Sequence, residues 1–172
     1  MSTSTRDRML VDRTLDGKTD RESCEWIGES KETIDKLVQA EAALVGGAGN
    51  VILAGFSQGG ALALYVGLQR EAEPLAGIVS MSGYLPARGR WQVAEGSRRV
   101  PVGFFHGTAD EVVKSDWAEQ ALLALQAQDV ASSSIKLYTG MGHSAVQEEI
   151  ADVAAFIRHA LGPAAGGAGA SL

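Results

Sequence analysis

Short apolar runs alternate along the sequence with longer stretches in which apolar residues recur at helical spacing. Four runs are too short for helices and are expected to be buried strands, at residues 51–56, 76–81, 100–105 and 135–138. Helices are expected around them, at residues 22–45, 61–69, 116–128 and 145–161. Strands that alternate with helices form a parallel sheet covered by helices on both faces. The pattern therefore predicts an α/β fold whose strands share one carboxyl edge.

Two details of the helices are also predicted. The first helix carries its apolar residues at offsets that place them on one face, which is expected to pack on the core: Trp26, Ile27, Ile34, Leu37, Val38, Leu44 and Val45. Ser115 is expected to cap the helix that follows it, because a serine side chain can accept a hydrogen bond from a free backbone amide.

The length and composition predict one globular domain. The chain has 172 residues, of which 45% are hydrophobic and 21% charged. Residues 1–21 mix charged residues with Ser, Thr and Gly without a period, and residues 162–172 are rich in Ala and Gly. Both are expected to be poorly ordered, which leaves residues 22–161 as the folded domain.

The charge and the cysteine content exclude several classes of protein. The net charge of −6, with no basic stripe, argues against a nucleic-acid partner. No apolar run approaches the 18 or so residues of a membrane span, and the polar N-terminus does not resemble a signal peptide. Cys24 is the only cysteine, so an internal disulfide is excluded. These features predict a cytoplasmic protein.

The first predicted strand runs directly into the motif Gly-x-Ser-x-Gly, formed by Gly55, Phe56, Ser57, Gln58 and Gly59. A helical stretch follows it. In this setting the serine stands at a sharp turn between strand and helix, and the glycines allow the two elements to approach. A Gly-rich turn without function is the alternative. The strand before the motif and the helix after it favour a nucleophilic serine at Ser57.

A nucleophilic serine needs a base, and the sequence holds three histidines. His143 lies in a glycine-rich loop after the last predicted strand, so it can reach the carboxyl edge of the sheet. His106 closes the third strand, where no mobile loop would carry it to the serine. His159 lies near the end of the last helix, where a histidine complements the helix dipole. We therefore expect His143 to be the base.

The base needs a carboxylate to orient it. Asp110 follows the third strand by a tight turn and emerges at the same edge, although the spacing alone does not exclude Glu111. The order Ser57, Asp110, His143 along the chain is that of α/β-hydrolases. The three residues are thus expected to form a catalytic triad for acyl transfer.

Four segments resemble motifs of the acyl-protein thioesterase, carboxylesterase and lysophospholipase family. They are GFSQGGALAL at residues 55–64, MSGYLP at 81–86, HGTADEVV at 106–113 and GMGHS at 140–144. The resemblance extends over about residues 20–161. It implies an α/β-hydrolase that cleaves acyl esters and thioesters, including those of S-acylated proteins, without a metal or cofactor. It also implies Asp110, not Glu111, as the acid.

The sequence departs from the family in two places. Lys114 stands where the family usually has a proline, which affects only the rigidity of a loop. The chain also has no His-Gly-x-Gly-Asp segment before the first predicted strand. In the family that segment supplies one oxyanion donor, so the backbone N–H of Gln58 is the donor expected here. The sequence is therefore interpreted as an N-terminally truncated member.

Without the missing strand, residues 51–56 become a sheet edge with no charge and no proline. Self-association through this edge is expected unless residues 1–21 fold over it. Two alternatives to the full activity remain: an inactive homologue that binds acyl groups or a protein, and a hydrolase of non-lipid esters.

Overall fold

The computed structural model describes residues 25–87, 91–130 and 132–162. Four parallel strands form one sheet in the order β1-β2-β3-β4, the order in which they occur in the chain. The strands are β1 (Ile52–Phe56), β2 (Gly77–Met81), β3 (Val102–Gly107) and β4 (Ser133–Tyr138). Each lies within two residues of its predicted start and end. The parallel α/β fold predicted from the sequence is therefore confirmed.

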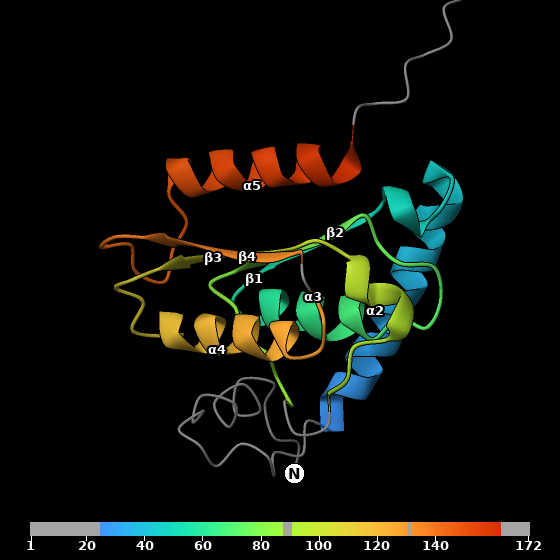
Figure 1. Cartoon of the computed structure of the whole chain (residues 1–172), viewed down its shortest axis with the longest axis horizontal. Coiled ribbons are helices and arrows are strands. Elements are labelled where there is room, and N and C mark those ends of the chain that lie inside the picture. Colours follow the sequence, from blue (N-terminus) through green and yellow to red (C-terminus); the bar gives the residue numbers. More distant parts are fainter. Residues whose placement is uncertain (1–24, 88–90, 131, 163–172) are drawn as a thin grey trace, which may run out of the picture.

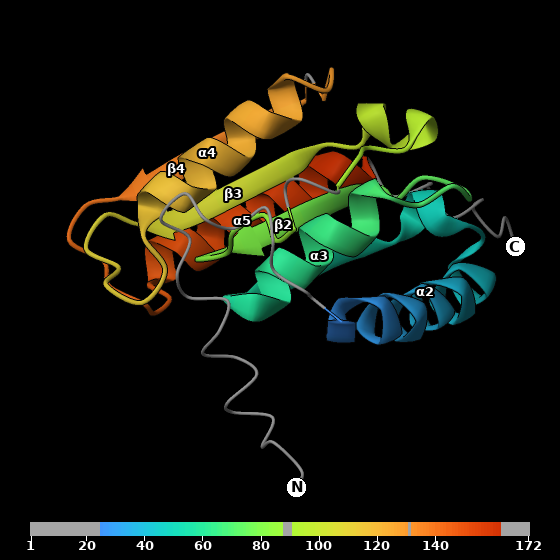
Figure 2. The ribbon, with the colours of Figure 1, turned by 90° about the horizontal axis from the view of Figure 1, so that it is seen from below.

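Helices cover both faces of the sheet, as predicted (Figure 1). Helix α5 (Gln147–Leu161) packs on one face, against β2 and β3. Helices α3 (Gln58–Leu68) and α4 (Ser115–Gln126) pack on the other. Helix α2 (Glu25–Val45) lies outside the sheet, alongside α3 (Figure 2). Two short 3-10 helices, η2 (Ala48–Asn50) and η4 (Glu95–Arg99), complete the elements of the described residues.

The two larger clusters of the core lie on opposite faces of the sheet, because side chains of a strand alternate between its faces. Ile78, Val102 and Phe104 point toward α3 and α4 and belong to the larger cluster. Val79 and Phe105 point toward α5, where they pack with Val153. Both clusters hold the sheet rigid, so the loops at its carboxyl edge project from a fixed base.

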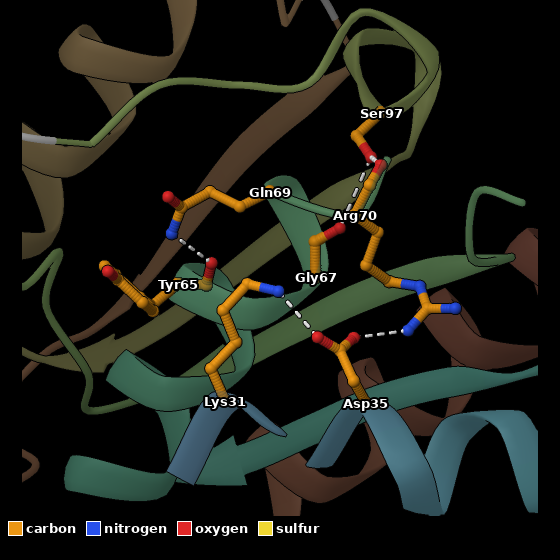
Figure 3. A network of polar contacts seen from close by, with 7 residues as sticks. All are labelled: Lys31, Asp35, Tyr65, Gly67, Gln69, Arg70 and Ser97. Atoms are coloured by element: carbon orange, nitrogen blue, oxygen red, sulfur yellow. Dashed lines mark hydrogen bonds and ion pairs between the residues drawn. The ribbon is translucent and has the colours of Figure 1, made fainter. Parts of the chain in front are cut away.

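Asp35 bridges α2 to the end of α3 (Figure 3). One oxygen of its carboxylate lies 2.6 Å from Nη1 of Arg70, and the other lies 2.6 Å from Nζ of Lys31. The side chain of Arg70 is almost entirely buried, and a buried cation needs an anionic partner. The hydroxyl of Ser97 in η4 lies within hydrogen-bond distance of the carbonyl oxygens of Gly67 and Arg70. Together these contacts join α2, α3 and η4.

The prediction that one apolar face of α2 is buried is wrong in part. Ile27 and Val38 are buried, but Leu37 and Leu44 expose 59% and 80% of their surface, and Val45 is exposed as well. Among the described elements, α2 packs mainly on α3 and on the short η2, so only a narrow stripe of it is covered.

The prediction that Ser115 caps the next helix is also wrong. Ser115 is the first residue of α4, Lys114 occupies the N-cap position, and no side chain caps the helix there.

The predicted poorly ordered segments, residues 1–21 and 162–172, lie outside the described residues except for Gly162, which ends α5 with φ of 70°. Among the helices of residues 25–87, 91–130 and 132–162, none is both long and apolar enough to cross a membrane.

Candidate active site

Ser57 is the single residue between β1 and α3. Its backbone has φ of 56° and ψ of −122°, a conformation that L-residues rarely adopt. The turn is held by two hydrogen bonds: the Ser57 N–H donates to the carbonyl of Met81 at 2.8 Å, and the Ala61 N–H donates to the carbonyl of Ser57 at 3.1 Å. The hydroxyl is thereby presented at the carboxyl edge of the sheet.

The glycines of the motif do not share one steric role. A Cβ added at Gly55 would lie 2.2 Å from the backbone of Gly59, so β1 and α3 approach too closely there for any side chain. A Cβ at Gly60 would lie 2.9 Å from Oγ of Ser80. A Cβ at Gly59 itself would meet no described atom within 4 Å. The close approach predicted for Gly55 and Gly59 therefore falls at Gly55 and Gly60.

His143 lies in the loop between β4 and α5, and this loop brings its imidazole over Ser57. Nε2 of His143 is 2.9 Å from Oγ of Ser57, and Nδ1 is 2.7 Å from Oδ2 of Asp110. Three side chains from the ends of β1, β3 and β4 thus form one continuous hydrogen-bonded chain. These are the three side chains singled out in the sequence.

Asp110 lies in the turn after β3, and its side chain is fully buried. Its Oδ1 accepts hydrogen bonds from the backbone N–H groups of Val112 and Val113, both at 2.9 Å. Burial alone would raise the pKa of the carboxyl group, but the hydrogen bonds from His143, Val113 and Val112 outweigh it and hold the pKa below its usual range. Glu111, which the spacing did not exclude, is exposed.

The other two histidines are not part of the hydrogen-bonded chain from Ser57 to Asp110. His159 is exposed in the last turn of α5, as its position in the sequence indicated. His106 is completely buried in β3, below the turn that carries Asp110, and its Nε2 lies 2.8 Å from the carbonyl oxygen of Val113. The sequence showed that His106 closes a strand but gave no sign of this contact, which depends on how the chain turns after Gly107.

Gln58 is the first residue of α3, so its backbone N–H has no carbonyl acceptor within the helix. It follows Ser57 directly and belongs to the positive end of the helix dipole. An amide in this position can stabilise negative charge on an oxygen near Ser57. In the part of the chain that the structure describes, no group of His, Cys, Asp and Glu side chains is arranged to hold a metal ion.

A parallel sheet with helices on both faces and a strained serine at the strand-to-helix turn defines the α/β-hydrolase class. The model of the phospholipase/carboxylesterase family matches residues 11–161. The chain therefore belongs to the phospholipase/carboxylesterase family.

Individual relatives agree with this assignment. The chain is 35% identical over 155 residues to acyl-protein thioesterase 1 of Gibberella zeae, covering 87% of this chain and 64% of that protein. It is 30% identical over 150 residues to acyl-protein thioesterase 1 homolog 1 of Dictyostelium discoideum, covering 87% and 66%. The crystal structure of esterase PE8 superimposes with a TM-score of 0.71 at 32% identity, covering 78% of this chain and 62% of that one. The chain thus spans just under two thirds of the length of these relatives.

Proposed function

We propose that this protein is a serine hydrolase that cleaves acyl esters and thioesters through an acyl-enzyme. The observation that carries the proposal is the hydrogen-bonded chain from Ser57 through His143 to Asp110. The family match and the names of the thioesterase and esterase relatives support it.

In the proposed reaction, His143 accepts the proton of the Ser57 hydroxyl through Nε2 while Oγ attacks the acyl carbonyl carbon. The resulting tetrahedral intermediate expels the alcohol or thiol, which takes the proton from His143. Water then attacks the acyl-enzyme with His143 again as the base, and the free acid leaves. Asp110 holds the Nδ1–H tautomer of His143 and stabilises the imidazolium that forms at each step.

The backbone N–H of Gln58 supplies the proposed oxyanion donor. No metal or other cofactor takes part in this mechanism. Because relatives are named acyl-protein thioesterases, S-acylated proteins are the proposed substrate class, with smaller acyl esters as further substrates. We assign the activity to the cytoplasm, since the only cysteine leaves no internal disulfide to require an oxidising compartment.

Labelling with a fluorophosphonate probe tests the proposal most directly, because the probe reacts with activated serines. The wild-type chain should be labelled and should hydrolyse p-nitrophenyl acetate. Ser57→Ala and His143→Ala should each abolish both signals, and the double variant should lose no more than either single one. His159→Ala replaces an exposed histidine and is the matched control. Loss of activity in His159→Ala with full activity in His143→Ala would show the assignment to be wrong.

A second candidate function concerns residues 1–172 taken alone, which contain no His-Gly-x-Gly-Asp segment and cover 64% of the Gibberella zeae relative. Such a chain could bind acyl groups or a protein with little catalysis. Loss of one oxyanion donor lowers turnover about 10²–10³-fold. Adding a family-type His-Gly-x-Gly-Asp strand at the N-terminus should then raise turnover about a hundredfold. Rapid cleavage of long-chain thioesters by the unmodified chain, at about 10 per second, would refute this second candidate.

A further inference from the structure

His106 is a titratable side chain packed under the turn that carries Asp110, and the proposed reaction does not use it. Its exposed fraction is 0%, and its Nε2 lies 2.8 Å from the Val113 carbonyl oxygen and 3.5 Å from Oδ2 of Asp110. Val113 in turn donates its own N–H to Oδ1 of Asp110 at 2.9 Å. Val113 thus links the buried imidazole to the carboxylate by two hydrogen bonds, beside the longer direct approach of Nε2 to Oδ2.

The surroundings of His106 define which nitrogen carries the proton. A carbonyl oxygen is an acceptor only, so Nε2 must be the donor to Val113. Nδ1 is buried and has no hydrogen-bond partner among the described residues, so a second proton there would lack an acceptor. Burial lowers the pKa of the imidazole, although the Val113 carbonyl and the charge of Asp110 act in the opposite direction. His106 is therefore neutral, with its proton on Nε2.

We propose that His106 is a positioning residue for the triad: its Nε2–H anchors the Val113 carbonyl and so fixes the turn from which Asp110 reaches His143. The inference rests on the proposed function, because it assigns a role in the same reaction. It differs from the role of Asp110, since His106 touches neither Ser57 nor His143 and acts through Val113. The neutral state matters as well, because a cation at His106 would compete with the imidazolium of His143 for the same carboxylate.

A pair of substitutions separates the hydrogen bond from simple packing. In His106→Gln the side-chain amide can place an N–H near the position of Nε2, whereas His106→Met fills a similar volume without a donor. We expect His106→Met to lower kcat about 10- to 100-fold with KM changed less than about twofold, since a misplaced catalytic group costs turnover more than binding. His106→Gln should restore kcat to within about threefold of wild type. Equal losses in both variants, or none in His106→Met, would overturn the proposal.

Two NMR measurements test the proposed positioning role of His106 without an activity assay. The His143 Nδ1–H that is bonded to Asp110 should give a far-downfield proton signal in wild type and His106→Gln, and this signal should be lost or broadened in His106→Met. Nitrogen-15 spectra of the wild-type histidines should show His106 as the neutral Nε2–H tautomer from pH 7 to 8, a test that needs no variant to fold. An unchanged downfield signal in His106→Met, or an Nδ1–H or charged His106 at pH 7, contradicts the inference. If every variant and the wild type lack esterase activity while the NMR results hold, the proposed function fails and the positioning contact stands.

Discussion

The ring of Phe56 packs against the imidazole of His143, with the ring centroids 4.8 Å apart and the planes tilted by 43°. Phe56 is the last residue of β1 and precedes Ser57, so the strand that presents the nucleophile also supports the base. Phe56 remains 40% exposed.

Replacement of Phe56 by alanine should therefore loosen His143 without removing a polar contact of the triad. An aromatic pair contributes about 0.5–1.5 kcal/mol beyond its buried area, so we expect Phe56→Ala to lower kcat about two- to tenfold on p-nitrophenyl acetate. Phe156→Ala is the matched control, because Phe156 packs on Phe105 below α5, away from Ser57. The control should lower the melting temperature and leave kcat of the folded protein near wild type. A fall in kcat in the control equal to that in Phe56→Ala would contradict the role of the ring.

The two glycines of the serine motif should respond differently to alanine. Gly55→Ala places a methyl group 2.2 Å from the backbone of Gly59 and must push β1 and α3 apart. We expect it to destabilise the fold by more than about 2 kcal/mol and to abolish activity. Gly59→Ala meets open space in the first turn of a helix, so it should be tolerated within about 0.5 kcal/mol. Urea unfolding and ester hydrolysis check both variants; similar behaviour of the two would show that the close approach is misplaced.

The buried His106 should make the stability of the protein depend on pH. Its pKa is lowered on folding, so between the folded value and about 6.5 the unfolded chain binds a proton that the folded chain does not. The contribution of His106 to the free energy of unfolding is therefore fully present above pH 6.5 and is lost as the pH falls toward the folded pKa. This contribution is at most about 1.4 kcal/mol between pH 7.5 and 5.5.

Urea unfolding at pH 7.5 and 5.5 measures this contribution. His106→Gln should reduce the difference in unfolding free energy between the two pH values, whereas His159→Gln, at an exposed position, should leave the difference unchanged. A larger pH dependence in His106→Gln than in wild type would show that the pKa of His106 is not lowered on folding.

The outer strand of the sheet should promote self-association. Among the described residues β1 pairs with β2 alone, and Ala54 and Phe56 on it are exposed. The strand has neither charge nor proline to protect its free edge. Ala54→Lys should shift sedimentation toward the monomer, whereas Ile150→Lys, which adds the same charge at an exposed position on α5, should not. A chain without residues 1–21 that remains monomeric at about 100 μM, a concentration at which exposed sheet edges commonly associate, would refute this prediction.

Much of the fold follows from local sequence patterns, and the site follows from the fold. The short apolar runs were sufficient to predict β1 to β4, and the parallel order then brought Ser57, Asp110 and His143 to one edge. The choice between Asp110 and Glu111 could not come from spacing. It depends on the turn in which Val112 and Val113 donate to Asp110.

Sequence patterns missed features that depend on how elements turn and pack, which the spacing of residue types does not show. The spacing of apolar residues in α2 predicted burial of Leu37 and Leu44, but a periodic pattern does not show how many neighbours a helix has. The contact between His106 and Val113 is likewise invisible in the sequence, because a strand residue and the turn after it share no fixed period.

The strands lie in the sheet in the same order as in the chain, and this order has a consequence for folding during protein synthesis. Each strand pairs with the one made just before it, so the sheet can extend strand by strand as the chain leaves the ribosome, without waiting for distant segments. Ser57 is in place early, Asp110 joins with β3, and His143 arrives only after β4 has added to the edge. A nascent chain that has reached β3 would hold a nucleophile with no base. The proposed triad is therefore complete only after β4 has joined the sheet, and a shorter intermediate lacks the base that the proposed hydrolysis needs.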